Sequence, residues 1–472
     1  MLRPAAFSLV VLLAAGCVRY HAQPISPAAS LESLESRRLD APELGAFLTS
    51  RGAVSSWPPR RLNLQLLTLA AFYYSPTLDI ARAQWAVTRG GVVTAGARPN
   101  PTITGGLGYN ASTPSSGVTP WIPEVVLDLP IDIAGKRGLR INQARHLSEV
   151  ARLNLLSAAW QVRSRVRIAF LELLAARHTD SLLTVEQGYQ VEVVRILEAQ
   201  GAAGDVSAFE VNQARLALAE VRISALDVTE RRARAQSALA QAIGIAPAVL
   251  EGLAPEFADL DQLADRPPAN EIRRRALVNR SDVRAALAEY EASQAALRLE
   301  VRRQFPDINL GPGYQLDQTE SKWSLSLSLP IPLLNRNRGP IAEADARRQE
   351  AAARFVALQT QVLAEIEAAV ASSAVLLPQL AAADSLVAGL ARQEQSAQAR
   401  YAAGDIGKLQ LLGLEVELTR TALVRLDAVV RAQLAVGALE DAMQSPLKLE
   451  PWIVDSPIRP GGPWPESRRV PR

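Results

Sequence analysis

The sequence predicts a mostly α-helical fold with a small β part. Duplicated long helices are expected to build a coiled-coil tunnel, and four β-strands per chain to contribute to a shared trimeric membrane β-barrel. Three observations support this fold class. The second half of the chain repeats the first. The longest segments carry apolar residues at heptad spacing, and the short segments between them alternate apolar and polar residues.

Composition excludes several classes of protein. Of 472 residues, 48% are hydrophobic and 21% are charged, so the chain can bury a core and is not of the disordered type. The net charge of +3 is spread along the chain and gives no basic patch for nucleic acid. A single Cys, 3 His and 2 Met exclude internal disulfides and a recognisable His or Met metal cage. We therefore expect no metal site and no cofactor.

The N-terminus has the pattern of an export signal. Arg3 precedes a short apolar run, which is typical of a signal peptide over residues 1–16 and is too short to span a bilayer. The run ends in LAAG before Cys17, which resembles a bacterial lipobox, so Cys17 is expected to be lipidated and to begin an N-terminal segment over 17–60. Val18 in place of Asp resembles lipoproteins sent to the outer membrane. The alternative is an ordinary signal peptide with an incidental Cys.

The rest of the chain contains two copies of one unit. The repeats are expected over 61–250 and 271–444, followed by a Pro-rich tail over 445–472. The landmarks are RYAAGDI at 400–406 against QGAAGDV at 200–206, LPI at 329–331 against 129–131, and RSDV at 280–283 against SPTL at 75–78. The offset is 200 residues for the first two pairs and 205 for the third, which one insertion or deletion explains.

Each repeat has the same predicted order of elements: a helix, a β-hairpin, a very long helix and a returning helix. No later run of 18 or more apolar residues predicts a transmembrane helix. In the two repeats the expected helices are Arg61–Ala97 and Glu271–Gln304, Arg137–Gln200 and Ile341–Arg400, and Val206–Ile243 and Ile406–Met443. The two shorter helices of a repeat, stacked end to end, would match the long helix in length.

The long helices carry a coiled-coil seam. Apolar residues recur at alternating steps of four and three, which is a heptad a/d pattern. In the first repeat they are Leu155, Ala159, Val162, Val166, Ala169, Leu173 and Ala176; the equivalent positions are Phe355, Gln359, Val362, Ile366, Ala369, Ser373 and Leu376. The alternative is core packing in a soluble helical bundle.

The short segments between the helices alternate like membrane strands. In residues 323–329 (WSLSLSL), four apolar side chains face one side and three serines the other. Tyr109 and Trp121 bracket the first hairpin tip, and Tyr314 and Trp323 the second, so we expect one interfacial aromatic girdle. The alternative is the edge of a soluble sandwich.

Four strands cannot close a barrel by themselves, because an open edge has unpaired backbone groups that lipid cannot satisfy. Two or more chains must therefore share one barrel. Three chains would supply twelve strands and a ring of helices below them.

The helix–helix turns are the candidate functional ends of the two repeats. Gly204 and Gly404 are expected to end the long helices in the left-handed conformation, and Asp205 and Asp405 to cap the helices that follow. The sequence contains no phosphate-binding loop, no Gly-x-Ser-x-Gly and no His-Glu-x-x-His. It therefore predicts passive conduction and not an enzyme.

At this point the sequence resembles the TolC-like outer-membrane efflux factor family, over essentially the whole mature chain. The features that carry the resemblance are the duplicated unit, RSDV at 280–283, QFPDI at 304–308 and LPIPLLNRNRG at 329–339, the last of which looks most like the CzcC and CusC heavy-metal branch. The family implies a homotrimer in the outer membrane, a periplasmic helical tunnel, and docking on a periplasmic adaptor protein and an inner-membrane pump.

The resemblance also implies roles for the turns. The tips at Gly204, Asp205, Gly404 and Asp405 would dock the adaptor, and Tyr401, Gly404, Asp405 and Lys408 would form the periplasmic aperture. Some family members carry acidic residues just downstream that ring the closed aperture. Gln410 and Gly413 occupy those places here, which puts a strong acidic ring in doubt.

The interpretation is therefore an outer-membrane efflux channel that conducts exported solutes, heavy-metal cations among the candidates. Within channels, drug efflux and type I protein secretion stay open. A periplasmic helical scaffold or adhesin without a pore is the alternative of another class, although it has no need of alternating hairpins with aromatic ends.

Overall fold

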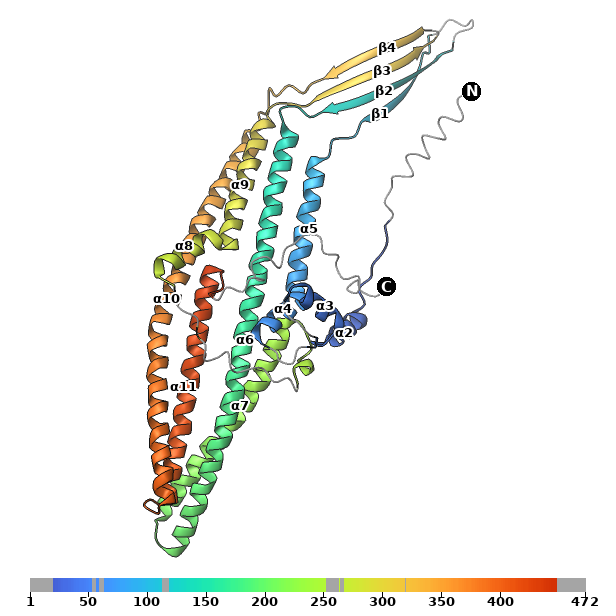
Figure 1. Ribbon diagram of the computed structural model, residues 1–472. Helices are drawn as coiled ribbons and strands as arrows, with labels where there is room; N and C mark the ends of the chain where they lie inside the picture. The colour runs from blue at the N-terminus through green and yellow to red at the C-terminus, as the bar shows by residue number, and fades with distance from the viewer. Residues whose placement is uncertain are drawn as a thin grey trace.

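The computed structural model describes residues 20–52, 57–58, 63–112, 119–251, 263, 267–318 and 320–447. The expected signal peptide, Cys17 and tail residues 448–472 lie outside these ranges. The molecule is a long rod of helices with a small β-sheet at one end (Figure 1). The mostly helical fold class with four strands per chain is confirmed.

Two very long helices set the length of the rod. Helix α6 (Lys136–Ala203) has 68 residues and helix α10 (Arg338–Ala402) has 65, or about 100 Å each at 1.5 Å per residue. Both run from the sheet to the opposite end, where α7 (Ala208–Ile243) and α11 (Lys408–Met443) turn back beside them (Figure 1).

The helix that opens each repeat is broken, which corrects the expectation of single helices over Arg61–Ala97 and Glu271–Gln304. The first consists of α4 (Leu64–Tyr74) and α5 (Pro76–Gly96), and the second of α8 (Ala269–Asn279) and α9 (Ser281–Arg302). Ser75 adopts an extended ψ of 118° because it precedes a proline. Arg280, at the equivalent position, has a ψ of 122° although serine follows it.

The predicted heptad seam is confirmed. All seven apolar positions from Leu155 to Ala176 are buried, and so are Val362, Ile366, Ala369 and Ser373 in the second repeat. The first-repeat seam from Leu155 to Leu173 belongs to the largest core, which also includes residues of α4, α7 and α11. Helix α6 contacts α5, α7, α9 and α11, so it is the central column of the chain.

The four strands form one antiparallel sheet in the order β1-β2-β3-β4. The strands are β1 (Thr102–Tyr109), β2 (Trp121–Ile131), β3 (Ile308–Asp317) and β4 (Glu320–Ser328). Strand β2 pairs with β3, so the sheet joins the two repeats. Strands β1 and β4 are its two edges.

The N-terminal segment packs against the middle of the rod. It contains α2 (Pro27–Glu35) and α3 (Pro42–Ser50). Leu39, Leu44 and Leu48 are buried in the same core as α4, α6 and α7. A 3₁₀ turn, η1 (Pro247–Leu250), follows α7 in the same region.

Within the described ranges, α10 includes a window of 18 residues that is long and apolar enough to cross a bilayer, and 6% of that window is buried. The most apolar part of α10 is rich in Ala, Leu and Val, but Pro378, Gln379 and Asp384 interrupt it, so it is not an unbroken apolar run. One chain by itself leaves this apolar surface bare.

Candidate functional site: the strand faces and the helix tips

The sheet has one apolar face. In the pairing register Leu310 lies opposite both Leu129 and Leu327, and Ile103 lies opposite Leu127, so apolar side chains align across all four strands. The large residues of this face are Ile103, Leu107, Tyr109, Trp121, Val125, Leu127, Leu129, Ile131, Ile308, Leu310, Tyr314, Leu316, Trp323, Leu325 and Leu327. Several are among the most exposed apolar residues of the chain, with Trp323 at 82% and Leu325 at 74%.

The opposite face is mainly polar, with serines, glycines and charged residues, and it also includes Ile122 and Val126 of β2. Ser326 donates a hydrogen bond from Oγ to the carbonyl of Gly311 at 3.0 Å. A Cβ at Gly313 would lie 2.6 Å from Oγ of Ser324, so a larger residue there would have to displace that hydroxyl. The charged residues of this face are Glu124, Asp128, Asp317, Glu320 and Lys322. A sheet with these two faces is suited to separating lipid from water.

The aromatic residues expected at the strand ends form two cross-strand pairs. The ring centroids of Tyr109 and Trp121 are 5.0 Å apart, and those of Tyr314 and Trp323 are 4.9 Å apart. Tyr314 pairs with Val125, four residues along β2 from Trp121. Both pairs lie on the apolar face, but at different positions along the strands.

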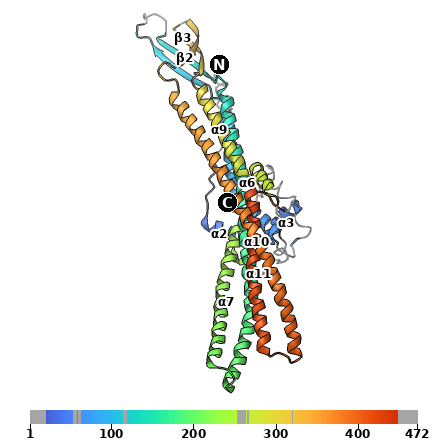
Figure 2. The same cartoon turned by 90° about the vertical axis from the view of Figure 1, so that its left-hand side faces the viewer.

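The two helix tips lie at the opposite end of the rod from the sheet, and Figure 2 shows the two lower hairpins diverging toward them. Gly204 and Gly404 have φ of 85° and 83°, so the predicted left-handed conformation is confirmed at both. Asp205 and Asp405 each donate a backbone N–H, to the carbonyls of Gln200 and Arg400, at 2.9 Å. These identical bonds are those of a Schellman motif, which satisfies the last carbonyls of a helix.

The expectation that Asp205 and Asp405 cap the following helices is wrong, because each lies two residues before the N-cap. Helix α7 is capped by Ser207, whose side chain exchanges hydrogen bonds with Glu210 in a capping box. The N-cap position of α11 is Gly407, which has no side chain to cap with. Both aspartates are exposed at the tips.

The second tip brings Tyr401 and Lys408 together. The Lys408 ammonium lies 5.4 Å from the centre of the Tyr401 ring, within cation–π distance, and Tyr401 is 41% exposed. The charge of Lys408 also affects Glu192 of α6. Hydrogen bonds from Arg195 hold the pKa of the Glu192 carboxyl below its ordinary value; burial opposes this, and the charges of Arg195 and Lys408 add to it.

A charged network that the sequence analysis missed joins α6 to α11. Arg167 contacts Glu440 at 2.9 Å and Asp441 at 2.6 Å, and Arg163 contacts Glu440 at 2.8 Å. Gly437 makes room for it, since a Cβ there would lie 2.5 Å from the Arg167 guanidinium. Nearer the tips, buried Glu186 accepts from Arg420 at 2.8 Å.

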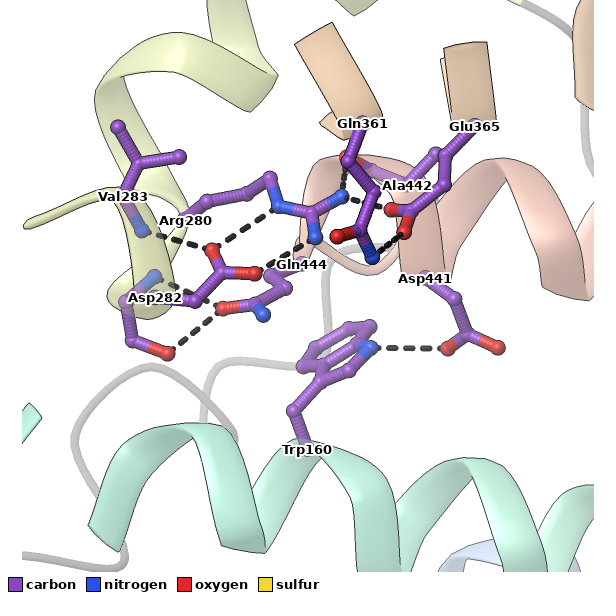
Figure 3. A network of polar contacts seen from close by, with 10 residues as sticks. Trp160, Arg280, Asp282, Val283, Gln361, Glu365, Asp441, Ala442 and Gln444 are labelled. Carbon is purple, nitrogen blue, oxygen red and sulfur yellow. Dashed lines mark hydrogen bonds and ion pairs between the residues drawn. The ribbon is translucent and has the colours of Figure 1, made fainter. Parts of the chain in front are cut away.

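A second network closes the helix break in the second repeat (Figure 3). The Arg280 guanidinium binds Asp282 at 2.6 Å, Glu365 of α10 at 2.7 Å and the carbonyl of Ala442 at 3.1 Å. Ser281 is held by Gln444, which follows α11 and has a positive φ of 45°. The end of α11 therefore meets the start of α9.

In the first repeat, an arginine from outside the repeat binds the carbonyls at the helix break. Helix α7 ends at Gly244, so close to the break that a Cβ would lie 2.8 Å from the carbonyl of Tyr74. Arg37, between α2 and α3, donates to the carbonyls of Tyr74 at 3.0 Å and Gly244 at 2.6 Å. The N-terminal segment thus supplies the guanidinium that Arg280 supplies in the second repeat.

Two differences between the repeats indicate part of this arrangement. Position 280 is Arg where position 75 is Ser, and position 444 is Gln where position 244 is Gly. A buried Arg at a helix break needs carboxylate or carbonyl partners. No sequence pattern indicates that Arg37 reaches the other break, because that contact depends on the tertiary fold.

The structure brings together the tip residues of each hairpin, but leaves the aromatic pairs at the far end of the rod. Cys17 lies outside the described residues. Among the side chains that are described, no group of three or more His, Cys, Asp or Glu is placed to hold a metal ion. The described residues offer a sheet with one apolar face at one end of the rod and two exposed helix tips at the other.

Comparisons with known proteins point in one direction. A family model described as outer membrane efflux protein matches residues 71–245 and 272–443. The cobalt-zinc-cadmium resistance protein CzcC of Cupriavidus metallidurans is 28% identical over 298 residues, which are 61% of this chain and 68% of that protein.

Solved structures share the fold. The outer membrane protein VceC of Vibrio cholerae superposes with a TM-score of 0.66 at 22% identity, covering 82% of this chain and 97% of its own. CusC, whose structures describe transmembrane channel formation, has a TM-score of 0.65 at 18% identity, covering 80% of this chain and 91% of its own. At these identities the likeness concerns the fold.

Proposed function

The chain belongs to the outer membrane efflux protein family, and from that premise we propose that it is the outer-membrane channel of a tripartite efflux pump. Exported solutes would pass from a periplasmic adaptor and an inner-membrane pump through the helical tunnel and the barrel to the exterior. The observation that carries the proposal is the four-stranded sheet with one apolar and one polar face, mounted on helices about 100 Å long.

The open sheet supports a homotrimer. Strands β1 and β4 are edges, and an unpaired edge is not stable in lipid. Three copies give twelve strands, which close a barrel when β4 of one copy pairs with β1 of the next. The apolar face then lies toward lipid and the face with Ser324 and Ser326 toward the lumen.

The tips support an adaptor-docking role. Gly204, Asp205, Gly404 and Asp405 are exposed at the periplasmic end of the proposed tunnel, in two turns of identical backbone geometry. A partner built from repeated hairpins could bind both turns in the same way. The Tyr401–Lys408 contact lies beside the second turn, where it would help hold the aperture narrow.

Cys17 is proposed as a lipid anchor in the outer membrane. The N-terminal segment that follows it packs against the middle of the rod through Leu39, Leu44 and Leu48. Acyl chains on Cys17 would be a secondary attachment, because the trimeric barrel would hold the protein in the membrane without them.

Heavy-metal cations are the proposed substrate class, and the similarity to CzcC is what supports them. Drug efflux and type I protein secretion are the alternatives. A strain that lacks this chain should become more sensitive to cobalt, zinc or cadmium, while its sensitivity to hydrophobic drugs stays unchanged. The reverse pattern of sensitivities would assign the channel to drug efflux.

The channel itself is tested with purified protein in detergent. We expect a mass of three chains by light scattering, and ion-conducting steps in planar bilayers. A monomer that produces no conductance under conditions in which a known porin conducts would refute the proposal.

A further inference from the structure

The linker between β4 and α10 is an exposed apolar surface at the base of the sheet (Figure 1). Its large apolar residues follow Ser328, the last residue of β4. They are Leu329, Ile331, Leu333 and Leu334, which are 47%, 70%, 74% and 102% exposed. A run of large exposed apolar residues marks an interaction surface.

The linker continues the apolar face of the sheet. On β4 that face consists of Trp323, Leu325 and Leu327, and Leu329 and Ile331 extend the same alternation beyond the strand. The two surfaces are therefore continuous, and the proposed cover of the first is lipid.

The linker lies where the periplasmic boundary of the membrane is expected. Ile331 follows Trp323 by eight residues, which is about 26 Å at the rise of a strand. A strand tilted by about 40° then crosses roughly 20 Å of membrane, whereas the apolar band of an outer-membrane barrel is about 25 Å tall. Leu333 and Leu334 thus reach the edge of this band, and the residues after them lie at the level of the lipid headgroups.

Two arginines follow at that level. Arg336 and Arg338 are exposed, and neither has an ion-pair partner among the described residues. A guanidinium group suits phosphate well, because its planar donors can bind two phosphate oxygens at once. Arginines beside a membrane are attracted to anionic lipid headgroups.

Asn337, between the two arginines, fixes the backbone of the linker. It has a positive φ of 58°, and its backbone N–H donates to Oδ1 of Asn335 at 2.9 Å. Its Nδ2 donates to the carbonyl and to Oε2 of Glu300, at 2.7 and 3.0 Å. Glu300 also accepts from Arg303 at 2.6 Å, so this carboxylate already has two side-chain partners.

The equivalent linker of the first repeat is neutralised within the chain. At the offset of 200 residues Arg336 corresponds to Lys136, which is 5% exposed and binds Asp307 at 2.9 Å. Asp132 of the same linker binds Arg140 at 2.6 Å. The cations of this linker therefore have carboxylate partners.

The second repeat keeps the cation but lacks both carboxylates. Pro332 stands where the first repeat has Asp132. The equivalent of Asp307 is Thr102, at the offset of 205 that relates the helices before the two hairpins. The second linker therefore combines exposed apolar residues with cations that have no counter-charge among the described residues.

We infer that this linker binds an anionic phospholipid of the periplasmic leaflet of the outer membrane. Arg336 and Arg338 bind the phosphate of its headgroup, and Leu333 and Leu334 lie against its acyl chains. The inference rests on the proposed channel and adds a lipid ligand at the rim of its barrel, one lipid for each copy.

Native mass spectrometry of the purified full-length trimer tests the inference. The trimer in detergent is titrated with phosphatidylglycerol and, separately, with phosphatidylcholine, which has the same acyl chains and no net charge. We expect one tightly bound phosphatidylglycerol per copy. Arg336→Gln combined with Arg338→Gln should weaken this binding roughly 25-fold, because each cation beside an anionic membrane surface contributes about a factor of five. Binding of phosphatidylcholine should hardly change.

The matched control is Arg231→Gln combined with Arg274→Gln. Both arginines are exposed, and they lie on α7 and α8, away from the sheet. This control removes the same charge and should bind phosphatidylglycerol as the wild type does. Arg336→Lys combined with Arg338→Lys keeps the charge without the planar donors and should retain part of the binding.

A further variant separates the acyl contact from the charge. Leu333→Ser combined with Leu334→Ser keeps both arginines and should weaken the binding of both lipids. If this variant binds both lipids as tightly as the wild type does, the linker does not contact acyl chains and the inference is wrong.

Three other results would overturn the inference. They are equal binding of the two lipids by the wild type, equal binding of phosphatidylglycerol by the wild type and the double Gln variant, and displacement of the lipid by inorganic phosphate alone, which would indicate a site for soluble anions. In each case trimers that conduct in planar bilayers would leave the proposed channel standing. Monomers without conductance would overturn both.

Discussion

Gln444 holds Ser281 through a single oxygen: its Oε1 accepts hydrogen bonds from the backbone N–H of Ser281 at 2.8 Å and from the Ser281 hydroxyl at 2.7 Å. The side chain that follows α11 thereby caps the first turn of α9, although the two residues are far apart in sequence. This contact explains why a non-glycine residue is kept at a positive φ of 45°.

We predict that Gln444→Ala lowers the free energy of unfolding by about 1 kcal/mol, because the cap is lost while the left-handed backbone stays occupied by a residue with a Cβ. Gln444→Gly should be less damaging, since glycine relieves the backbone. Thermal melting by circular dichroism measures the difference. If both variants melt alike, the backbone strain is negligible and the cap alone matters.

A substitution at Gly244, the equivalent position in the first repeat, should destabilise the protein for a different reason. Gly244→Ala places a Cβ 2.8 Å from the carbonyl of Tyr74 at a φ of 89°, so backbone strain alone should cost roughly 1–2 kcal/mol. Gly52→Ala also has a positive φ, but no described atom lies within 4 Å of its Cβ, so it isolates the contribution of the backbone. Gly244→Ala should lower the melting temperature more than this control does.

Replacing Arg280 by lysine should destabilise the helix break between α8 and α9. Arg280 is 5% exposed and binds Asp282 with two nitrogens, a geometry that an ammonium cannot reproduce. Arg280→Lys should cost about 2 kcal/mol, with Arg303→Lys, in an exposed pair, as the control near zero. Thermal melting by circular dichroism measures both. Equal stability would mean that the carboxylates find other partners.

The two faces of the sheet should respond differently to substitution. Leu327→Arg puts a charge on the apolar face and should cost roughly 2–4 kcal/mol near the membrane midplane, so the yield of trimer should collapse. Ser326→Leu changes the polar face, where Gly311 leaves room, and should assemble. Assembly of both to the same extent would show that the faces are assigned wrongly.

Opening of the tip should depend on the ring of Tyr401 rather than on its hydroxyl, because the contact within the chain is between that ring and Lys408. Tyr401→Ala and Lys408→Ala should increase single-channel conductance or opening frequency, whereas Tyr401→Phe keeps the contact. Trimer stability should not change. Higher conductance for Tyr401→Phe would point to a hydrogen bond between copies.

Acid should weaken the upper rod through Glu149. Hydrogen bonds from Arg152 hold the pKa of this carboxyl below its ordinary value of 4.5; burial opposes this, and the charges of Arg152 and Arg284 add to it. The stabilisation is present above pH 4.5 and is lost as pH falls through the lower folded pKa. Melting temperatures across pH 3–7 should converge for wild type and Glu149→Gln at the acid end, and differ at neutral pH.

Sequence patterns predicted those parts of the fold that local rules control. The seam from Leu155 to Ala176 follows from helical periodicity, and the left-handed turns at Gly204 and Gly404 follow from helix ends that need glycine. Neither helix break was expected, although Pro76 marks the first, and no proline marks the break before Ser281. The contact of Arg37 with the carbonyl of Gly244 was missed because it joins segments that only the folded chain brings together.

Gly437 and Arg167 constrain the order in which substitutions at these two positions can be accepted. With Arg167 present, any side chain at 437 collides with the guanidinium, so the glycine is fixed. Once Arg167 is replaced by a small residue, position 437 becomes free to gain a side chain and a better helix former. That order loses the ion pairs of Arg167 with Glu440 and Asp441 in its first step, so neither single change is neutral. Descendants that have gained a side chain at 437 must restore the glycine before the arginine can return.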